Sequence, residues 1–248
     1  MYRRALKIAM AAAVVYLAVE AISFVGLLLL GRRGVVYNPR PAALNQEQKA
    51  SLIRFLSPVR TTTLAMDPVI GWTRLALPSL AAPGQASEIN AAGMRDDKEY
   101  APFPSAGIVR IEAFGDSFTF SSDVTLQQSW ARRLAGMSPR LEVLNYGVGA
   151  FGLDQAYLRY LEKGTAFHPH VVFIGYMTEN FQRDVNVFRP FYSSVYGDWI
   201  FSKPRFQLHN GELVLLKNPL PSVQEYRRLL QHPAEVLQDL AGMTITIT

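Results

Sequence analysis

The sequence contains no cysteine. This absence excludes disulfide bonds, catalysis by a thiol and zinc held by cysteine, although it says little about the cellular compartment. Charged residues are also few, at 18% of the chain, whereas apolar residues make up 49%. That balance is typical of a globular protein that also carries a membrane-like segment.

Most of the chain also lacks an excess of positive charge. The formal net charge is +5, yet residues 1–40 alone carry six basic side chains against one acidic side chain, Glu20. The rest of the chain holds 19 basic and 19 acidic residues and is neutral. Because the excess is confined to the N-terminus, the charge offers no reason to expect nucleic acid as a partner.

The N-terminal region contains a long apolar run. Residues 8–31 carry one charge, Glu20, and are long enough to span a bilayer as a helix. A cleavable signal peptide has a shorter apolar region, roughly 7–15 residues, and a small-residue cleavage site. This run is longer and ends in "LLLLGRR". We therefore predict a single retained anchor that contacts the lipid bilayer through residues 8–31, with a cleaved signal as the alternative.

Basic residues flank both ends of this run, so charge decides the orientation only weakly. Arg3, Arg4 and Lys7 precede it and slightly favour an N-terminus in the cytoplasm. The rest of the chain would then lie outside the cytoplasm. We accordingly divide the chain into an anchor (1–34), a Pro/Ala-rich linker and lead-in segment (35–107) and a larger domain (108–248).

Within the third part, predicted strands and helices alternate. Apolar runs predict strands at 108–114, 141–146 and 170–176, the last of them buried, and helical periodicity predicts helices at 126–137 and 153–164. This order is typical of an α/β fold with a parallel sheet and helices on both faces. Further on, residues 198–217 predict a β-hairpin that turns at Asn210-Gly211.

Three loops follow the three predicted strands, and in such folds ligands bind at the carboxyl ends of the strands. The first loop, "GDSFTFSSDV", offers Ser117 as a nucleophile, or as an ordinary turn or helix-capping residue. The second, "NYGVGAFGLDQ", has glycines whose amides could face a substrate oxygen. The third, "GYMTENFQRDV", places Asn180 where its side-chain amide could donate to an oxyanion.

Two other interpretations of these loops stay open. Gly147, Gly149 and Gly152 match the G-x-G-x-x-G spacing of dinucleotide-binding loops, but no acidic residue closes the following strand. In the third loop, Arg183 and Asp184 are typical of a solvated loop, with a contact at the rim as the alternative.

Taken together, the serine, glycine and asparagine loops resemble those of the SGNH (GDSL-type) hydrolase superfamily, in the form of its membrane-anchored bacterial members. The resemblance covers roughly residues 108–217. It implies a three-layer αβα, flavodoxin-like sheet, with Ser117 as the nucleophile of an esterase. It also implies an oxyanion hole built from the amides of Ser117 and of Gly149 or Ala150, with Asn180 as a further donor. An ester-bearing substrate, such as an acylated glycan or lipid, is implied, and neither a cofactor nor a metal is expected.

The chain departs from the family pattern at two points. Ala150 stands where the family has glycine, and its amide can serve equally if its φ angle is negative. The family's C-terminal Asp-x-x-His block, which supplies the base, is missing, because no aspartate has histidine three residues later. We therefore expect a domain and a sheet that are incomplete at the C-terminus. A catalytically incompetent scaffold or binding protein is the alternative function.

The four histidines offer no obvious replacement for this base. His168 and His170 begin the third predicted strand and should lie at the amino end of the sheet, opposite the three loops. His209 adjoins the hairpin turn, and His232 precedes a proline in a late helical region.

Overall fold

The computed structural model describes residues 2–32, 43–57, 63–76, 88–193 and 200–244. Two compact units are present, Met1–Pro41 and Ala42–Thr248. The first unit contains α1 (Tyr2–Arg32). The elements of the second unit are α2 (Gln46–Leu56), β1 (Leu64–Asp67), β2 (Gly71–Arg74), β3 (Val109–Phe114), α3 (Ser117–Phe120), η2 (Leu126–Gln128), α4 (Trp130–Ala135), β4 (Leu141–Asn145), α5 (Leu153–Lys163), β5 (Val171–Ile174), α6 (Asn180–Asp184), η3 (Arg189–Phe191), β6 (Arg205–His209), β7 (Glu212–Leu216), α7 (Val223–Gln231) and α8 (Pro233–Gly242).

Helix α1 confirms that the N-terminal run is helical. Its segment Leu6–Gly26 is long and apolar enough to cross a membrane, since 21 residues of helix extend about 32 Å. The side chains described along this segment are exposed rather than packed against protein. An apolar helix with such exposed side chains is suited to a lipid environment.

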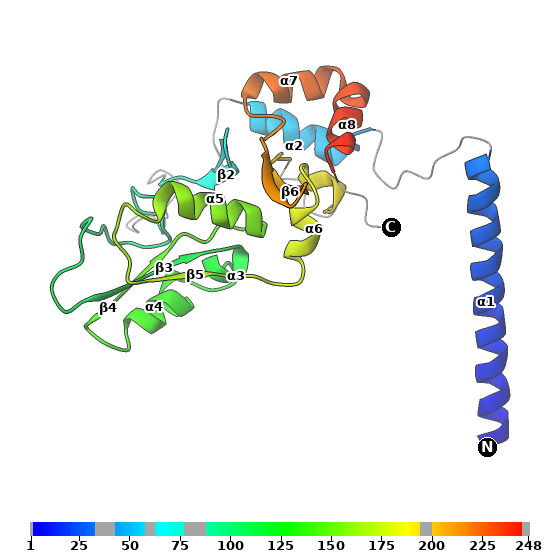
Figure 1. The fold of residues 1–248 in the computed structure, drawn as a ribbon, viewed down its shortest axis with the longest axis horizontal. Helices are drawn as coiled ribbons and strands as arrows, with labels where there is room; N and C mark the ends of the chain where they lie inside the picture. The colour runs from blue at the N-terminus through cyan, green and yellow to red at the C-terminus, as the bar shows by residue number, and fades with distance from the viewer. Residues whose placement is uncertain (1, 33–42, 58–62, 77–87, 194–199, 245–248) are drawn as a thin grey trace. The chain divides into compact units, whose positions relative to one another are not determined.

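Strands β3, β4 and β5 form a parallel sheet in the order β4-β3-β5 (Figure 1). Helix α4 packs on one face, where Ala131 meets Ile111 and Val143. Helix α5 packs on the other face, where Ala156 joins Phe114 and Leu144. The structure thus confirms an α/β sheet whose strands are joined by helical crossovers. In the described part of the chain this parallel sheet has three strands, so the larger flavodoxin-like arrangement stays a prediction.

The prediction of a buried strand at 170–176 is wrong. In β5, Val171, Phe173 and Ile174 are exposed, Phe173 at 45%. Strand β5 lies at the edge of the described sheet, where it pairs with β3 alone. Helix α4 packs near β3 and β4, so it does not cover the apolar side chains of β5 on that face.

The predicted helix at 126–137 is interrupted. Ser129 has extended backbone angles, and its hydroxyl accepts a hydrogen bond from Arg132 N (3.3 Å). It therefore ends η2 and caps α4, as serine does at helix N-termini. Trp130 and Leu134, four residues apart, still pack together under the sheet.

A second core lies outside the sheet and joins distant parts of the chain. Leu52 of α2 and Trp72 of β2 are fully buried against Phe201 and Tyr226. Figure 1 shows α2 beside α7, which in turn packs against α8. The lead-in segment therefore contributes to the core of the second unit, because its apolar side chains pack with those of residues 187–240.

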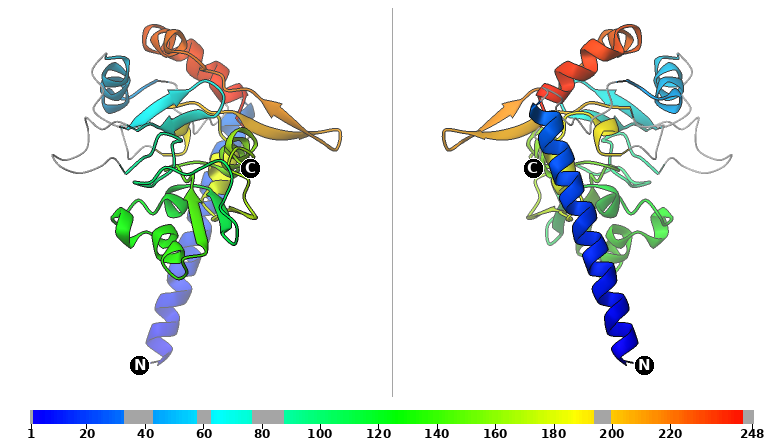
Figure 2. Two further views of the ribbon diagram at one scale, coloured as in Figure 1. Left: turned by 90° about the vertical axis from the view of Figure 1, so that its left-hand side faces the viewer. Right: turned by 90° about the vertical axis from the view of Figure 1, so that its right-hand side faces the viewer.

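Strands β6 and β7 form the predicted hairpin. They pair antiparallel, and the turn residues Asn210 and Gly211 both have positive φ angles, 51° and 84°. Asparagine and glycine are the residues that adopt this conformation most readily. Figure 2 shows the hairpin projecting from the remainder of the second unit.

Candidate active site

Ser117 is the first residue of α3, and Gly115 and Asp116 separate it from the end of β3 at Phe114. The cap of this helix is Asp116, whose Oδ1 accepts a hydrogen bond from Phe118 N (2.9 Å). Asp116, rather than Ser117, is therefore the N-cap of α3. Ser117 is half-buried, and its hydroxyl has no hydrogen-bond partner among the described residues. The side chain is thus available for other chemistry.

The first loop requires a glycine before the serine. A Cβ on Gly115 would collide with the Thr119 side chain. The loop is fixed at its far end by the buried Arg95, which donates to Phe120 O (2.7 Å) and Val124 O (2.6 Å) and pairs with Glu88 (3.1 Å). These bonds hold the short turn of α3 that carries the serine.

The second loop leaves two backbone amides free. Val148 N bonds to Gly115 O (3.0 Å), which ties this loop to the first. The next two amides, those of Gly149 and Ala150, have no acceptor among the described residues. Both residues are buried. Free amides of this kind are what an oxyanion hole needs.

The condition set for Ala150 is not met, because its φ angle is +64°. This left-handed conformation is unfavourable for a residue with a Cβ and favours glycine. The alanine therefore carries backbone strain at the position where the family pattern has glycine, but its N–H has no acceptor among the described residues and can still donate. The neighbouring Gly149 accepts a hydrogen bond at its carbonyl from Trp72 Nε1 (3.1 Å), so the lead-in segment supports this loop.

Asn180 begins α6 and is almost fully buried. Its Oδ1 accepts from Met177 N (2.7 Å), and its Nδ2 donates to Phe151 O (2.8 Å). These two bonds fix the orientation of the amide and connect the third loop to the second. One N–H of the amide has this partner, which leaves the other N–H to donate elsewhere.

The interpretation of Arg183 as part of a solvated loop is wrong, and the alternative, a contact at the rim, is what the structure shows. Its side chain is buried and its Nη1 donates to Asp116 Oδ2 (3.1 Å) and to Phe151 O (2.9 Å). One guanidinium from the third loop therefore holds the first and second loops together. Its place three residues after Asn180 puts both on one side of α6. This spacing is the only sequence signal for the contact.

Acidic residues surround the start of α5. Asp184 Oδ1 accepts from Leu153 N (2.7 Å), and the buried Asp154 pairs with Lys203 Nζ. Burial raises the pKa of Asp154 to about 6, and the charge of Lys203 opposes that change. Burial also raises the pKa of Asp184.

This arrangement disfavours the nucleotide-binding interpretation. A phosphate would need the helix N-terminus that these carboxylates occupy. The glycines also have packing roles: a Cβ on Gly147 would lie 2.8 Å from Thr119 C and 2.9 Å from Phe120 Cα.

The histidines lie where the sequence predicts. His170 Nδ1 accepts from Arg110 N (3.1 Å) at the amino end of the sheet, and the ring of His168 stacks on Phe103. His209 ends β6, and His232 precedes α8. None of these four described histidines belongs to the three loops, so the loops themselves supply no histidine that could act as the base.

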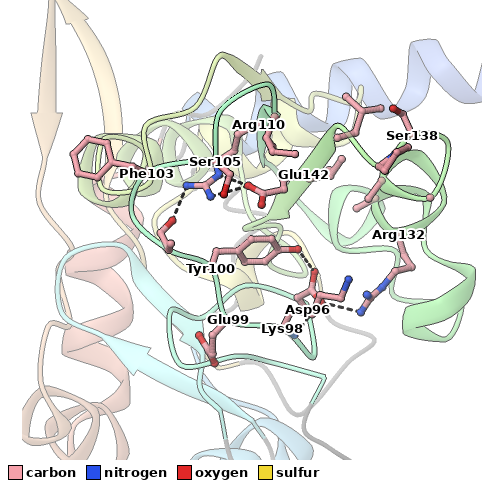
Figure 3. Close-up of a pocket in the computed structure, with 18 residues that line it drawn as sticks. Asp96, Lys98, Glu99, Tyr100, Phe103, Ser105, Arg110, Arg132, Ser138 and Glu142 are labelled. Atoms are coloured by element: carbon pink, nitrogen blue, oxygen red, sulfur yellow. Dashed lines mark hydrogen bonds and ion pairs between the residues drawn. The ribbon is translucent and has the colours of Figure 1, made fainter.

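A surface cavity of about 440 Å³ lies beside β4 (Figure 3). Its lining includes the ion pairs of Arg110 with Glu142 (2.7 Å) and of Arg132 with Asp96 (2.8 Å). Tyr100 Oη donates to the same Asp96 (2.7 Å). The predicted site residues are not part of the lining. Among the described residues, no group of three side chains suited to a metal ion occurs.

Comparisons with known proteins do not place the chain in a family. A scan against protein-family models finds no model that matches. A search of curated proteins likewise finds no significant match.

Proposed function

We propose that the chain is a membrane-tethered serine esterase of the SGNH type. Its nucleophile is Ser117, and its oxyanion donors are the amides of Ser117 and of Gly149 or Ala150, together with the side chain of Asn180. The proposed domain is of the flavodoxin-like αβα type, and the substrate bears an ester, with an acylated glycan or lipid as the expected class. The anchor crosses the membrane once, with the N-terminus in the cytoplasm.

One observation carries the proposal. The loops that follow β3, β4 and β5 are tied together by buried hydrogen bonds through Arg183, Asp116 and the carbonyl of Phe151. Around them lie a serine hydroxyl and two backbone amides that have no hydrogen-bond partner among the described residues. Acyl transfer needs a nucleophile beside donors that are fixed in advance.

Labelling with a serine-directed fluorophosphonate tests the nucleophile. The full chain in detergent should be labelled, and Ser117→Ala should abolish the labelling. Ser122→Ala is the matched control, because Ser122 is an exposed serine in the same loop. Labelling of Ser117→Ala at the wild-type rate would refute the assignment.

A second candidate is a catalytically incompetent binding or scaffold protein. It is favoured by the lack of a histidine in the three described loops, since removing the base of a serine triad lowers the rate by several orders of magnitude. Turnover of an aryl ester by the 248-residue chain decides between the two. Turnover that Ser117→Ala abolishes would exclude the scaffold, and its absence together with normal folding would favour it.

The anchor can be tested separately. Alkaline carbonate extraction of membranes should leave the full chain in the pellet and release a chain that lacks residues 1–34. Protease added on the non-cytoplasmic side of the membrane should digest the second unit if the N-terminus lies in the cytoplasm. Release of the full chain by carbonate would refute the anchor.

A further inference from the structure

The hairpin β6–β7 has one entirely apolar face. Phe206 lies opposite Leu215, and Leu208 lies opposite Leu213. Directly opposed residues, and residues two apart on one strand, share a face of a sheet. Leu208 is 74% exposed and Leu213 is 63% exposed. The opposite face is mixed and carries Arg205, Gln207, His209, Glu212, Val214 and Leu216.

This apolar face continues onto α5. Tyr157 and Leu161 are four residues apart, so they lie on one side of the helix, and both are exposed. The ring centroid of Tyr157 lies 5.9 Å from that of Phe206. The hairpin–α5 surface is therefore one continuous apolar area, defined by Tyr157, Leu161, Phe206, Leu208, Leu213 and Leu215.

We infer that the hairpin–α5 surface lies against a lipid bilayer. Exposed apolar areas of this kind mark sites of contact with membranes or other proteins. Protein interfaces combine apolar contacts with hydrogen bonds, about one per 100–200 Å². Among the side chains that define this surface, the hydroxyl of Tyr157 is the only polar group, whereas lipid contact requires no directional partner for a side chain.

The chain itself favours a lipid bilayer as the apolar partner of this surface. Helix α1 contains a segment that can cross a membrane, and residues 33–41 join it to the second unit. Because the anchor holds the second unit near the membrane at a high effective concentration, even a weak affinity of this surface for lipid is enough for binding. The inference thus rests on the anchoring part of the proposed function. It is independent of the esterase chemistry.

The lack of cysteine makes a clean experiment possible, because an introduced cysteine is the only thiol. The full chain is reconstituted in vesicles of equal parts phosphatidylcholine and phosphatidylglycerol, with an environment-sensitive fluorophore on Leu213→Cys. His209→Cys, on the opposite face of the same hairpin, is the matched control. Quenching by nitroxide on the lipid acyl chains is compared with quenching by aqueous iodide. A label on Leu17→Cys reports whether α1 is in the bilayer.

The expected result is several-fold stronger lipid quenching at position 213 than at position 209, with the reverse order for iodide. Equal and strong iodide quenching at both positions would overturn the inference. Protection of position 213 from both quenchers would also overturn it, because a second copy or another protein would then cover the surface. A water-exposed label at position 17 would refute the membrane anchor. Lipid quenching at position 213 would still support contact of the hairpin–α5 surface with the bilayer, and its absence would overturn that contact.

Discussion

Glu112 offers a quantitative test of the packing between the sheet and α5. Its side chain is fully buried in β3, and neither carboxylate oxygen has a hydrogen-bond partner among the described residues. Burial raises the pKa of Glu112 from 4.5 to about 7, and nearby Arg110 opposes this only in part. The folded protein thus holds the proton more tightly than the unfolded chain. The contribution of Glu112 to stability is therefore greatest below pH 4.5 and is lost as the pH rises toward 7.

The interval from 4.5 to about 7 corresponds to a loss of about 3 kcal/mol in the free energy of unfolding. Glu112→Gln removes the titration and keeps the shape. Urea denaturation of the full chain in detergent, followed by tryptophan fluorescence, measures both proteins below pH 4.5 and above pH 7. The wild type should lose about 3 kcal/mol more than the variant across this range.

Glu162→Gln is the control for this experiment. Glu162 lies on α5 with its side chain about half exposed, so its replacement should leave the wild-type pH dependence unchanged. Parallel pH dependences for the wild type and Glu112→Gln would refute the reasoning. They would mean that Glu112 is solvated or paired in solution.

Three further substitutions test the surroundings of the site. Lys203→Met leaves the buried carboxylate of Asp154 unpaired and should lower the free energy of unfolding by about 3–5 kcal/mol. Adding Asp154→Asn to this variant should restore part of the lost stability, and a loss below about 1 kcal/mol for Lys203→Met would contradict burial of the pair. Gly147→Ala places a Cβ against backbone atoms of the first loop and should lower the melting temperature by several degrees, while Gly242→Ala, which has open space, should not; equal melting temperatures would contradict the close approach. Trp72→Phe removes a donor to the glycine-rich loop and should cost about 1–3 kcal/mol in urea denaturation, unless that bond is absent.

Local patterns in the sequence predicted the elements well. Apolar runs that end at turn residues gave the three parallel strands, and Asn210-Gly211 marked the hairpin turn. The order of strands and helices also placed three loops at one edge of the sheet. These features depend on neighbouring residues, so a linear pattern is enough to find them.

Contacts between distant residues could not be predicted in the same way. The pairing of Arg183 with Asp116 spans 67 residues, and Trp72 bonds to a carbonyl 77 residues away. The exposure of β5 depends on what lies beside it in the sheet, which its own apolar sequence does not record. The positive φ of Ala150 is imposed by its loop, against the preference of the residue.

The core that joins α2 and β2 to α7 and α8 has a consequence for synthesis of the chain. Leu52 and Trp72 emerge from the ribosome well before their partners Tyr226 and Leu240, which lie much later in the sequence. The apolar side chains of α2 and β2 therefore lack these packing partners until α7 and α8 have been translated. Closing so long a loop slows folding and exposes the nascent chain to aggregation. We expect a chaperone to bind the segment that contains α2 and β2 until α7 and α8 have been synthesised.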